Sequence, residues 1–161
     1  MARGIAIRSF READLVPVGR LIHRTIEICY SGVYPPRAVR FFKEFHSGEK
    51  ILERHRKGEI LVVEKEGKVI ATGSVVAGEI LGVFVHPDFQ KNGYGRLLMD
   101  RLEDRLRAGG RPLAELSVSL PSRRFYENRG YELLEECSID VGEGQRLDFW
   151  KAAKTLAGGE A

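Results

Sequence analysis

The sequence has few of the features that assign a chain to a specialised class of protein. It contains two cysteines, Cys29 and Cys137, without CxxC spacing. Neither a disulfide framework nor a zinc site is therefore indicated, and we expect both thiols to lie in the core. No apolar run approaches the roughly 18 residues that span a bilayer, and the N-terminus lacks a secretory apolar region. These absences predict a cytoplasmic protein with no membrane partner.

Concentrated charge is also missing. The 26 basic and 23 acidic residues leave a net charge of +3, and the basic residues are scattered along the chain. This pattern disfavours a nucleic-acid partner, which usually meets a concentrated basic face. The four histidines do not cluster with acidic or cysteine residues at ligand spacing, so we expect no metal site.

The composition that remains is that of one ordinary globular domain. Of 161 residues, 43% are hydrophobic and 30% are charged, which is enough to bury a core without cross-links. We expect one domain over residues 1–155 and a frayed tail at 156–161.

The first half of the chain alternates between helical and strand patterns. Residues 4–10 alternate as a strand, and apolar residues then recur at helical spacing from Asp14, a plausible N-cap. The segment at 31–36 separates this helix from a second helical stretch, and a polar break at 46–48 precedes a third, short one. Three β-rich runs separated by two turns follow, which predicts an antiparallel meander.

The second half continues the same sheet. A helix after Tyr94 ends at a glycine pair, and residues 113–119 have the pattern of another strand. The strand, helix, strand crossover makes 80–86 and 113–119 parallel neighbours. A short helix then ends at Gly130, and a hairpin around 142–144 closes the sheet. The predicted architecture is mixed α/β.

The stretch VFVHPDFQKNGYGRLLM, residues 83–99, joins a strand, a glycine loop and a helix start. Four apolar residues between 98 and 106 share one helical face, and Gly95 lies in the middle of that face. Gly93 precedes the helix, where a larger side chain would cover the unpaired N–H groups of the first turn. The turn at 90–96 therefore suits a phosphate or diphosphate. The alternative is a tight turn that needs glycine only for its geometry.

Two common phosphate motifs are absent, because the chain contains neither GxxxxGK[ST] nor GxGxxG. The hexapeptide QKNGYG at 90–95 does fit [QR]xxGx[GA], two residues after LGVFVHP, and RFYENRGYE follows about thirty residues later. In these motifs and in its order of elements, the chain resembles the GNAT superfamily of N-acetyltransferases, whose equivalent loop binds the pyrophosphate of acetyl-CoA.

The resemblance implies a fold and an activity. The fold is single-domain and GNAT-like, with a mixed, mostly antiparallel sheet of six to seven strands, one parallel splayed strand pair and flanking helices. The activity is that of an acetyl-CoA-dependent N-acetyltransferase, with acetyl-CoA as co-substrate and an amine acceptor, small molecule or protein, as partner. Because no cysteine lies near either motif, we expect direct attack in a ternary complex. The alternative is a catalytically silent acyl-CoA-binding module, and a homodimer is left open.

The resemblance also assigns residues to the coenzyme. Backbone groups of the strand before the loop would pair with the pantetheine arm, and the thioester carbonyl would rest on the Val85 amide. Gly82 either eases that approach or marks a β-bulge. Ser119 replaces the asparagine that often holds the arm in this family. The complete set of expected coenzyme contacts is Val83, Phe84, Val85, Gln90, Lys91, Asn92, Gly93, Tyr94, Gly95, Arg96 and Ser119.

Acetyl transfer to an amine needs a base for the amine and an acid for the leaving thiolate. The resemblance places Tyr126 beside the coenzyme sulfur as the acid. It places Glu79 where some members carry a glutamate that deprotonates the amine through water. His86 and a water chain are the competing bases. Tyr30 and Tyr34 would either line the acceptor groove or pin the loop between the first two helices.

Overall fold

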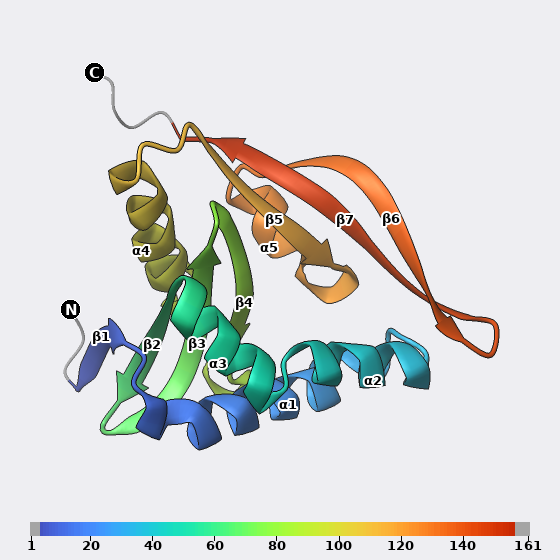
Figure 1. Cartoon of the computed structure of the whole chain (residues 1–161), viewed down its shortest axis with the longest axis horizontal. Coiled ribbons are helices and arrows are strands. Elements are labelled where there is room, and N and C mark those ends of the chain that lie inside the picture. The colour runs from blue at the N-terminus through green and yellow to red at the C-terminus, as the bar shows by residue number, and fades with distance from the viewer. Residues whose placement is uncertain (1–3, 157–161) are drawn as a thin grey trace.

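The computed structural model describes residues 4–156, which form one seven-stranded sheet with helices on both faces (Figure 1). The strands are β1 (Ile5–Ser9), β2 (Glu59–Lys65), β3 (Lys68–Val76), β4 (Glu79–Val85), β5 (Leu113–Ser119), β6 (Glu132–Gly142) and β7 (Gln145–Thr155). The helices are α1 (Leu15–Tyr30), α2 (Pro36–Phe45), α3 (Gly48–Lys57), α4 (Tyr94–Ala108) and α5 (Arg123–Asn128). The predicted α/β architecture is confirmed.

The strands are arranged in the order β1-β2-β3-β4-β5-β7-β6. All neighbours are antiparallel except β4 and β5, which form the predicted parallel pair. The last strand of the chain, β7, pairs with β5, so β6 forms the edge. In Figure 1 the β6–β7 hairpin reaches well beyond the rest of the sheet, with α2 beneath it.

The two larger hydrophobic cores lie on opposite faces of the sheet because successive strand residues point to opposite sides. In β2, Leu61 and Val63 join the core under α4 and α5, whereas Val62 joins the core under α1 and α3. Helix α4 contributes the predicted apolar face, with Leu98 and Met99 fully buried.

One charged residue of α4 is buried with that face. Glu103 is 1% exposed, and its carboxylate accepts hydrogen bonds from Arg129 at 2.8 Å, Tyr131 at 2.7 Å and Lys154 at 3.1 Å. Burial alone would raise the pKa of Glu103, but these three donors outweigh it and hold the pKa at about 2. The cluster ties α4 to the segment after α5 and to β7.

Replacing Glu103 by Gln is expected to lower the free energy of unfolding by about 3 kcal/mol at pH 7, because two cations lose their buried counter-charge. The folded-state pKa lies below the unfolded value, so this contribution is complete above about pH 4.5 and is lost as the pH falls toward 2. Urea unfolding at pH 7 and pH 3 tests both statements. Asp104→Asn, which removes an exposed partner of Arg107, is the control, and an equal loss in both variants would contradict the account.

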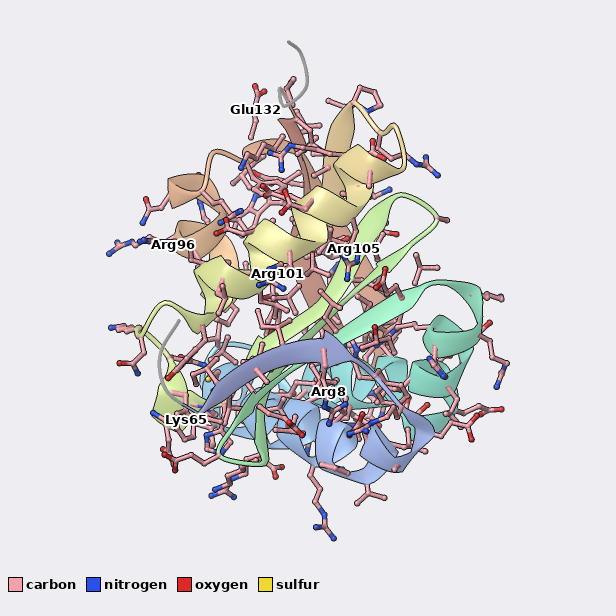
Figure 2. The ribbon with its side chains drawn as sticks, turned by 90° about the vertical axis from the view of Figure 1, so that its left-hand side faces the viewer. Arg8, Lys65, Arg96, Arg101, Arg105 and Glu132 are labelled. Carbon is pink, nitrogen blue, oxygen red and sulfur yellow. The ribbon has the colours of Figure 1, made fainter. Side chains whose placement is uncertain are left out.

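Three expectations need adjustment. Asp14 does precede α1, but its carboxylate accepts hydrogen bonds from Arg8 and from the Arg11 N–H instead of capping the helix. Figure 2 shows Arg8 close to α1. The prediction of core thiols is wrong, because both cysteines are only half-buried and are free. Leu156, the first residue of the expected tail, is buried and donates its N–H to Pro112.

Residues 157–161 of that tail lie outside the described part of the chain. Between residues 4 and 156, the structure contains no helix with the length and apolar character needed to cross a membrane.

Candidate active site

The site begins where β4 and β5 separate. Only two residue pairs join the strands, Glu79 with Glu115 and Ile80 with Leu116. Two residues after Ile80, Gly82 adopts φ +66°, and at this point two residues of β4 oppose one of β3. A bulge bends its strand, so β4 turns away from β5. The bulge predicted as one alternative for Gly82 is therefore present, and it opens the splayed pair.

The free edge of β4 carries unpaired backbone groups. The His86 N–H donates to Ile70 at 2.8 Å, and Val85 lies opposite Ala71 in the same register. Because N–H groups of an antiparallel strand alternate in direction, the Val85 N–H points away from β3, toward the gap. The main chain of β4 can therefore bond to an extended ligand inserted between the strands.

A cavity of about 290 Å³ occupies this gap. Its walls include Phe42 and His46 at the α2 end, Glu79 and Phe84 of β4, and Tyr126 of α5. Helices α2 and α5 pack on opposite faces of the sheet, so a single cavity can be lined by both only because the sheet is open between β4 and β5. A ligand could thus reach reacting groups from both faces.

The glycine loop lies at the end of β4. Gly93 has φ +88° and precedes the first residue of α4. In the described chain, no acceptor bonds to the backbone N–H groups of residues 91–96, and Lys91 also has a positive φ, of 65°. Six successive free N–H groups at a helix start favour an anion.

The side chains of the loop have different roles. Gln90 donates to the Val85 carbonyl at 2.9 Å, which fixes the strand to the loop, and Asn92 donates to the Gln90 carbonyl. Tyr94 packs back against Phe89 and accepts a hydrogen bond from Lys65 at 3.4 Å. These groups therefore shape the loop, and its backbone is left to contact a ligand.

Two further loop residues lie at the start of α4. A Cβ at Gly95 would meet the Phe125 ring at 3.1 Å, so this glycine lets α4 approach α5. Arg96 is exposed, and Figure 2 shows it on α4 together with Arg101 and Arg105. The start of the helix thus combines close packing at Gly95 with the positive charge of the exposed Arg96.

Tyr126 is 7% exposed and lines the cavity. Its hydroxyl makes no hydrogen bond to any described residue. Burial, with a smaller effect of Tyr30, raises the pKa of the Tyr126 phenol. The hydroxyl is therefore protonated at neutral pH and available as a donor to a ligand.

Glu79 lies at the start of β4 on the cavity wall. Partial burial raises the pKa of its carboxyl group, the facing Glu115 adds to this rise, and Lys151 opposes it. A carboxylate with a raised pKa is a better proton acceptor at neutral pH.

The remaining predicted groups fall into two sets. Ser119 lines the cavity and bonds to Tyr30 at 3.0 Å and to Ser122 at 2.8 Å. Tyr34 instead pins the loop, since its hydroxyl donates to Asp148 and accepts from the Leu120 N–H.

His86 lies outside the cavity walls. Its Nδ1 accepts a hydrogen bond from the Asp88 N–H at 3.0 Å, so the ring caps the turn that follows β4. Of the two candidate bases, Glu79 lines the cavity and His86 does not. His46 and the apolar residues of α2 were not predicted in the cavity, although Phe41, Phe42 and Phe45 show the helical spacing of an apolar face.

The fold and the open strand pair define a class of acyl-transfer domain, and comparisons with known proteins identify the family. The model of the acetyltransferase (GNAT) domain matches residues 56–133, which contain the bulge, the loop and α5. An amino-acid acetyltransferase of Ectopseudomonas mendocina is 30% identical over 77% of this chain. The match covers 27% of that relative, so this chain corresponds to about a quarter of its length.

Solved structures of acetyltransferases have the same fold as this chain. The GCN5-related N-acetyltransferase of Rhodopseudomonas palustris superposes with a TM-score of 0.87 at 20% identity, over 97% of this chain and 98% of that one. The PaiA N-acetyltransferase of Thermoplasma acidophilum, solved with coenzyme A, gives 0.78 at 19% identity, over 97% and 100%. These likenesses show the fold, and together with the family model they confirm the prediction: the chain belongs to the GNAT superfamily of acetyltransferases.

Proposed function

We propose that this protein is an acetyl-CoA-dependent N-acetyltransferase that transfers the acetyl group directly to a primary amine in a ternary complex. The observation that carries the proposal is that three features follow one another along β4: the loop at its end, the opening at its edge and the cavity. Six free N–H groups at 91–96 suit the diphosphate, the opening beside β4 suits the pantetheine arm, and the cavity beyond it has Tyr126 and Glu79 on its walls.

The residues would divide the chemistry as follows. The Val85 N–H, directed into the gap, would donate to the thioester oxygen and stabilise the negative charge that develops there. Glu79 would accept the proton of the amine, directly or through water. The buried Tyr126 hydroxyl would donate to the sulfur as the carbon–sulfur bond breaks. Ser119 would contact the pantetheine arm.

Coenzyme binding and turnover must be measured separately, because a catalytically silent acyl-CoA-binding module would share the loop and the slot. Calorimetry with CoA reports binding, and release of free thiol from acetyl-CoA over a panel of amines reports transfer. We expect CoA to bind, ATP and NAD not to displace it, and the acetyl group to be transferred to at least one amine. Binding without any transfer would support the module, and absence of CoA binding would contradict both.

The curated relative is named for amino acids, so these are the first acceptors to test. The cytoplasmic location and a homodimer stay predictions.

Removing the proposed base tests its role. Glu79→Gln is expected to lower kcat/KM for the amine about 100-fold at pH 7 without changing CoA affinity. Because a lysine-like amine loses its proton to water near pH 10.4, the deficit should shrink as the pH rises toward that value. The pH profile of the variant is the measurement.

Glu115→Gln is the control for the change in charge. It removes the repulsion that raises the pKa of Glu79, so the acidic limb of the wild-type profile should move to lower pH while the maximal rate persists. A Glu79→Gln profile parallel to the wild-type profile would remove the base assignment.

A further inference from the structure

The α2–α3 end of the cavity contains a second set of polar groups that the transfer chemistry does not use. His46, on the cavity wall, is 5% exposed, and its side chain makes no hydrogen bond to a described residue. Its Nδ1 is fully buried, so Nε2 is the ring nitrogen that can face a ligand in the cavity. The ring packs edge-on against Phe84 and Phe45. Buried polar side chains are nearly always hydrogen-bonded, so a partner for His46 is missing.

Arg54 of α3 does not itself line the cavity but packs against Phe45, which does. It is 7% exposed, donates to the Phe45 carbonyl at 2.7 Å and lies over the Phe45 ring at 5.4 Å. Its Nη1 approaches within 3.1 Å of the point where a Cβ on Gly82 would lie. Gly82 also lines the cavity, so the absent side chain lets the guanidinium reach the β4 wall.

The Arg54 charge has no acidic partner within 4 Å in the described chain, which sets it apart from the other buried charges. Asp14 is bonded to Arg8, and Glu103 is surrounded by donors. A buried charge without a counter-charge is costly. The fold pairs its charges elsewhere and leaves this one uncompensated beside the cavity.

The field of Arg54 reaches the cavity. Burial lowers the pKa of Arg54 only to about 10, so it is charged at neutral pH. Burial, followed by the charges of Arg54 and His23, lowers the pKa of His46 to about 3. His46 is therefore neutral and can donate one hydrogen bond, while the guanidinium acts on an anion across a medium of low dielectric constant.

We propose that the acceptor is a small amine that bears a carboxylate, held at the α2–α3 end of the cavity by the Arg54 charge and a hydrogen bond from His46. The site then has opposite polarity at its two ends. The amine lies toward Glu79, and the carboxylate lies toward Arg54. This inference rests on the proposed function and adds the substrate class.

Matched acceptors test it. Each L-amino acid is compared with its α-amide, which keeps the amine and the side chain but replaces the carboxylate by a neutral group. The wild type is expected to prefer the acids by about 10-fold or more in kcat/KM, because a nearby uncompensated positive charge attracts a carboxylate strongly at low dielectric constant. Arg54→Met should abolish the preference while leaving CoA affinity unchanged.

Arg56→Met is the matched control, because Arg56 is exposed on the same helix and its loss changes the net charge equally. It should keep the wild-type preference. Equal rates with acids and amides in the wild type, or a preserved preference in Arg54→Met, would overturn the inference. Transfer only to amines without a carboxylate would also overturn the inference, although the proposed acetyltransferase activity would then stand. If no compound is acetylated, calorimetry of the amino acids against the CoA-saturated protein decides, and absence of binding overturns the inference.

Stability distinguishes recognition from a structural role. If Arg54 is kept for a ligand, Arg54→Met removes an uncompensated buried charge and should raise the Tm of the ligand-free protein. If Arg54 serves mainly to hold the Phe45 carbonyl, the same substitution should lower the Tm. A lower Tm of Arg54→Met, together with an unchanged preference for acids over amides, would contradict the proposal.

Discussion

Gly93→Val is expected to weaken CoA binding by about 100-fold or more. The valine would cover the N–H groups of residues 91–96, and losing two charge-assisted hydrogen bonds of roughly 1.5–3 kcal/mol each is sufficient for this effect. The substitution also places a β-branched residue at φ +88°, which costs about 1–2 kcal/mol in the folded state. Calorimetry with CoA measures the affinity, and thermal unfolding measures the strain.

Gly144→Val separates these two effects. Gly144 has φ +73°, and, as at Gly93, an added Cβ would meet nothing within 4 Å. It lies in the turn of the β6–β7 hairpin, at the opposite end of the molecule from the start of α4 (Figure 1). Both variants should lose similar stability, and only Gly93→Val should lose CoA. Unchanged CoA affinity in Gly93→Val would mean that the loop glycine serves the turn alone.

The second large effect is expected from Tyr126→Phe, which should lower kcat about 100-fold with little change in the affinity for CoA. The hydroxyl has no partner in the described chain, so its removal breaks no hydrogen bond and the Tm should stay within experimental error. Steady-state kinetics with saturating acetyl-CoA, together with a CoA titration, provide the measurement.

Tyr34→Phe is the matched deletion of a hydroxyl group. Its hydroxyl bonds to Asp148 and to the Leu120 N–H, so this variant should lose stability by about 1–3 kcal/mol, because two hydrogen bonds of roughly 0.5–1.5 kcal/mol each are lost. Its effect on kcat should be far smaller. An equal loss of kcat and coenzyme affinity in Tyr126→Phe would remove the acid assignment.

Much of the fold was predictable because its signals are local. The meander, the helix ended by a glycine pair and the crossover each follow from spacing within about thirty residues. Gly93 and Gly95 were likewise recognisable, since a helix start with glycine at its N-cap has a short motif. Each of these predictions needed no knowledge of distant contacts.

Long-range contacts were not predictable. Glu103 has the helical position of a core residue but the chemistry of a surface residue, and its partners Arg129 and Lys154 lie 26 and 51 residues away. The role of the α2–α3 corner was missed for the same reason, because Arg54 becomes notable only once it is seen beside Gly82 without a carboxylate. Burial without a partner is a property of the folded chain and has no motif.

The central claim is that the free N–H groups at 91–96 bind the diphosphate of CoA while the β4 edge receives its pantetheine arm. Titrating ¹⁵N-labelled protein with CoA and following the backbone amide resonances tests it most directly. We predict that the largest saturable shifts will fall on residues 91–96 and on Val85. Saturable binding that leaves these amides unmoved, or no binding at all, would contradict it.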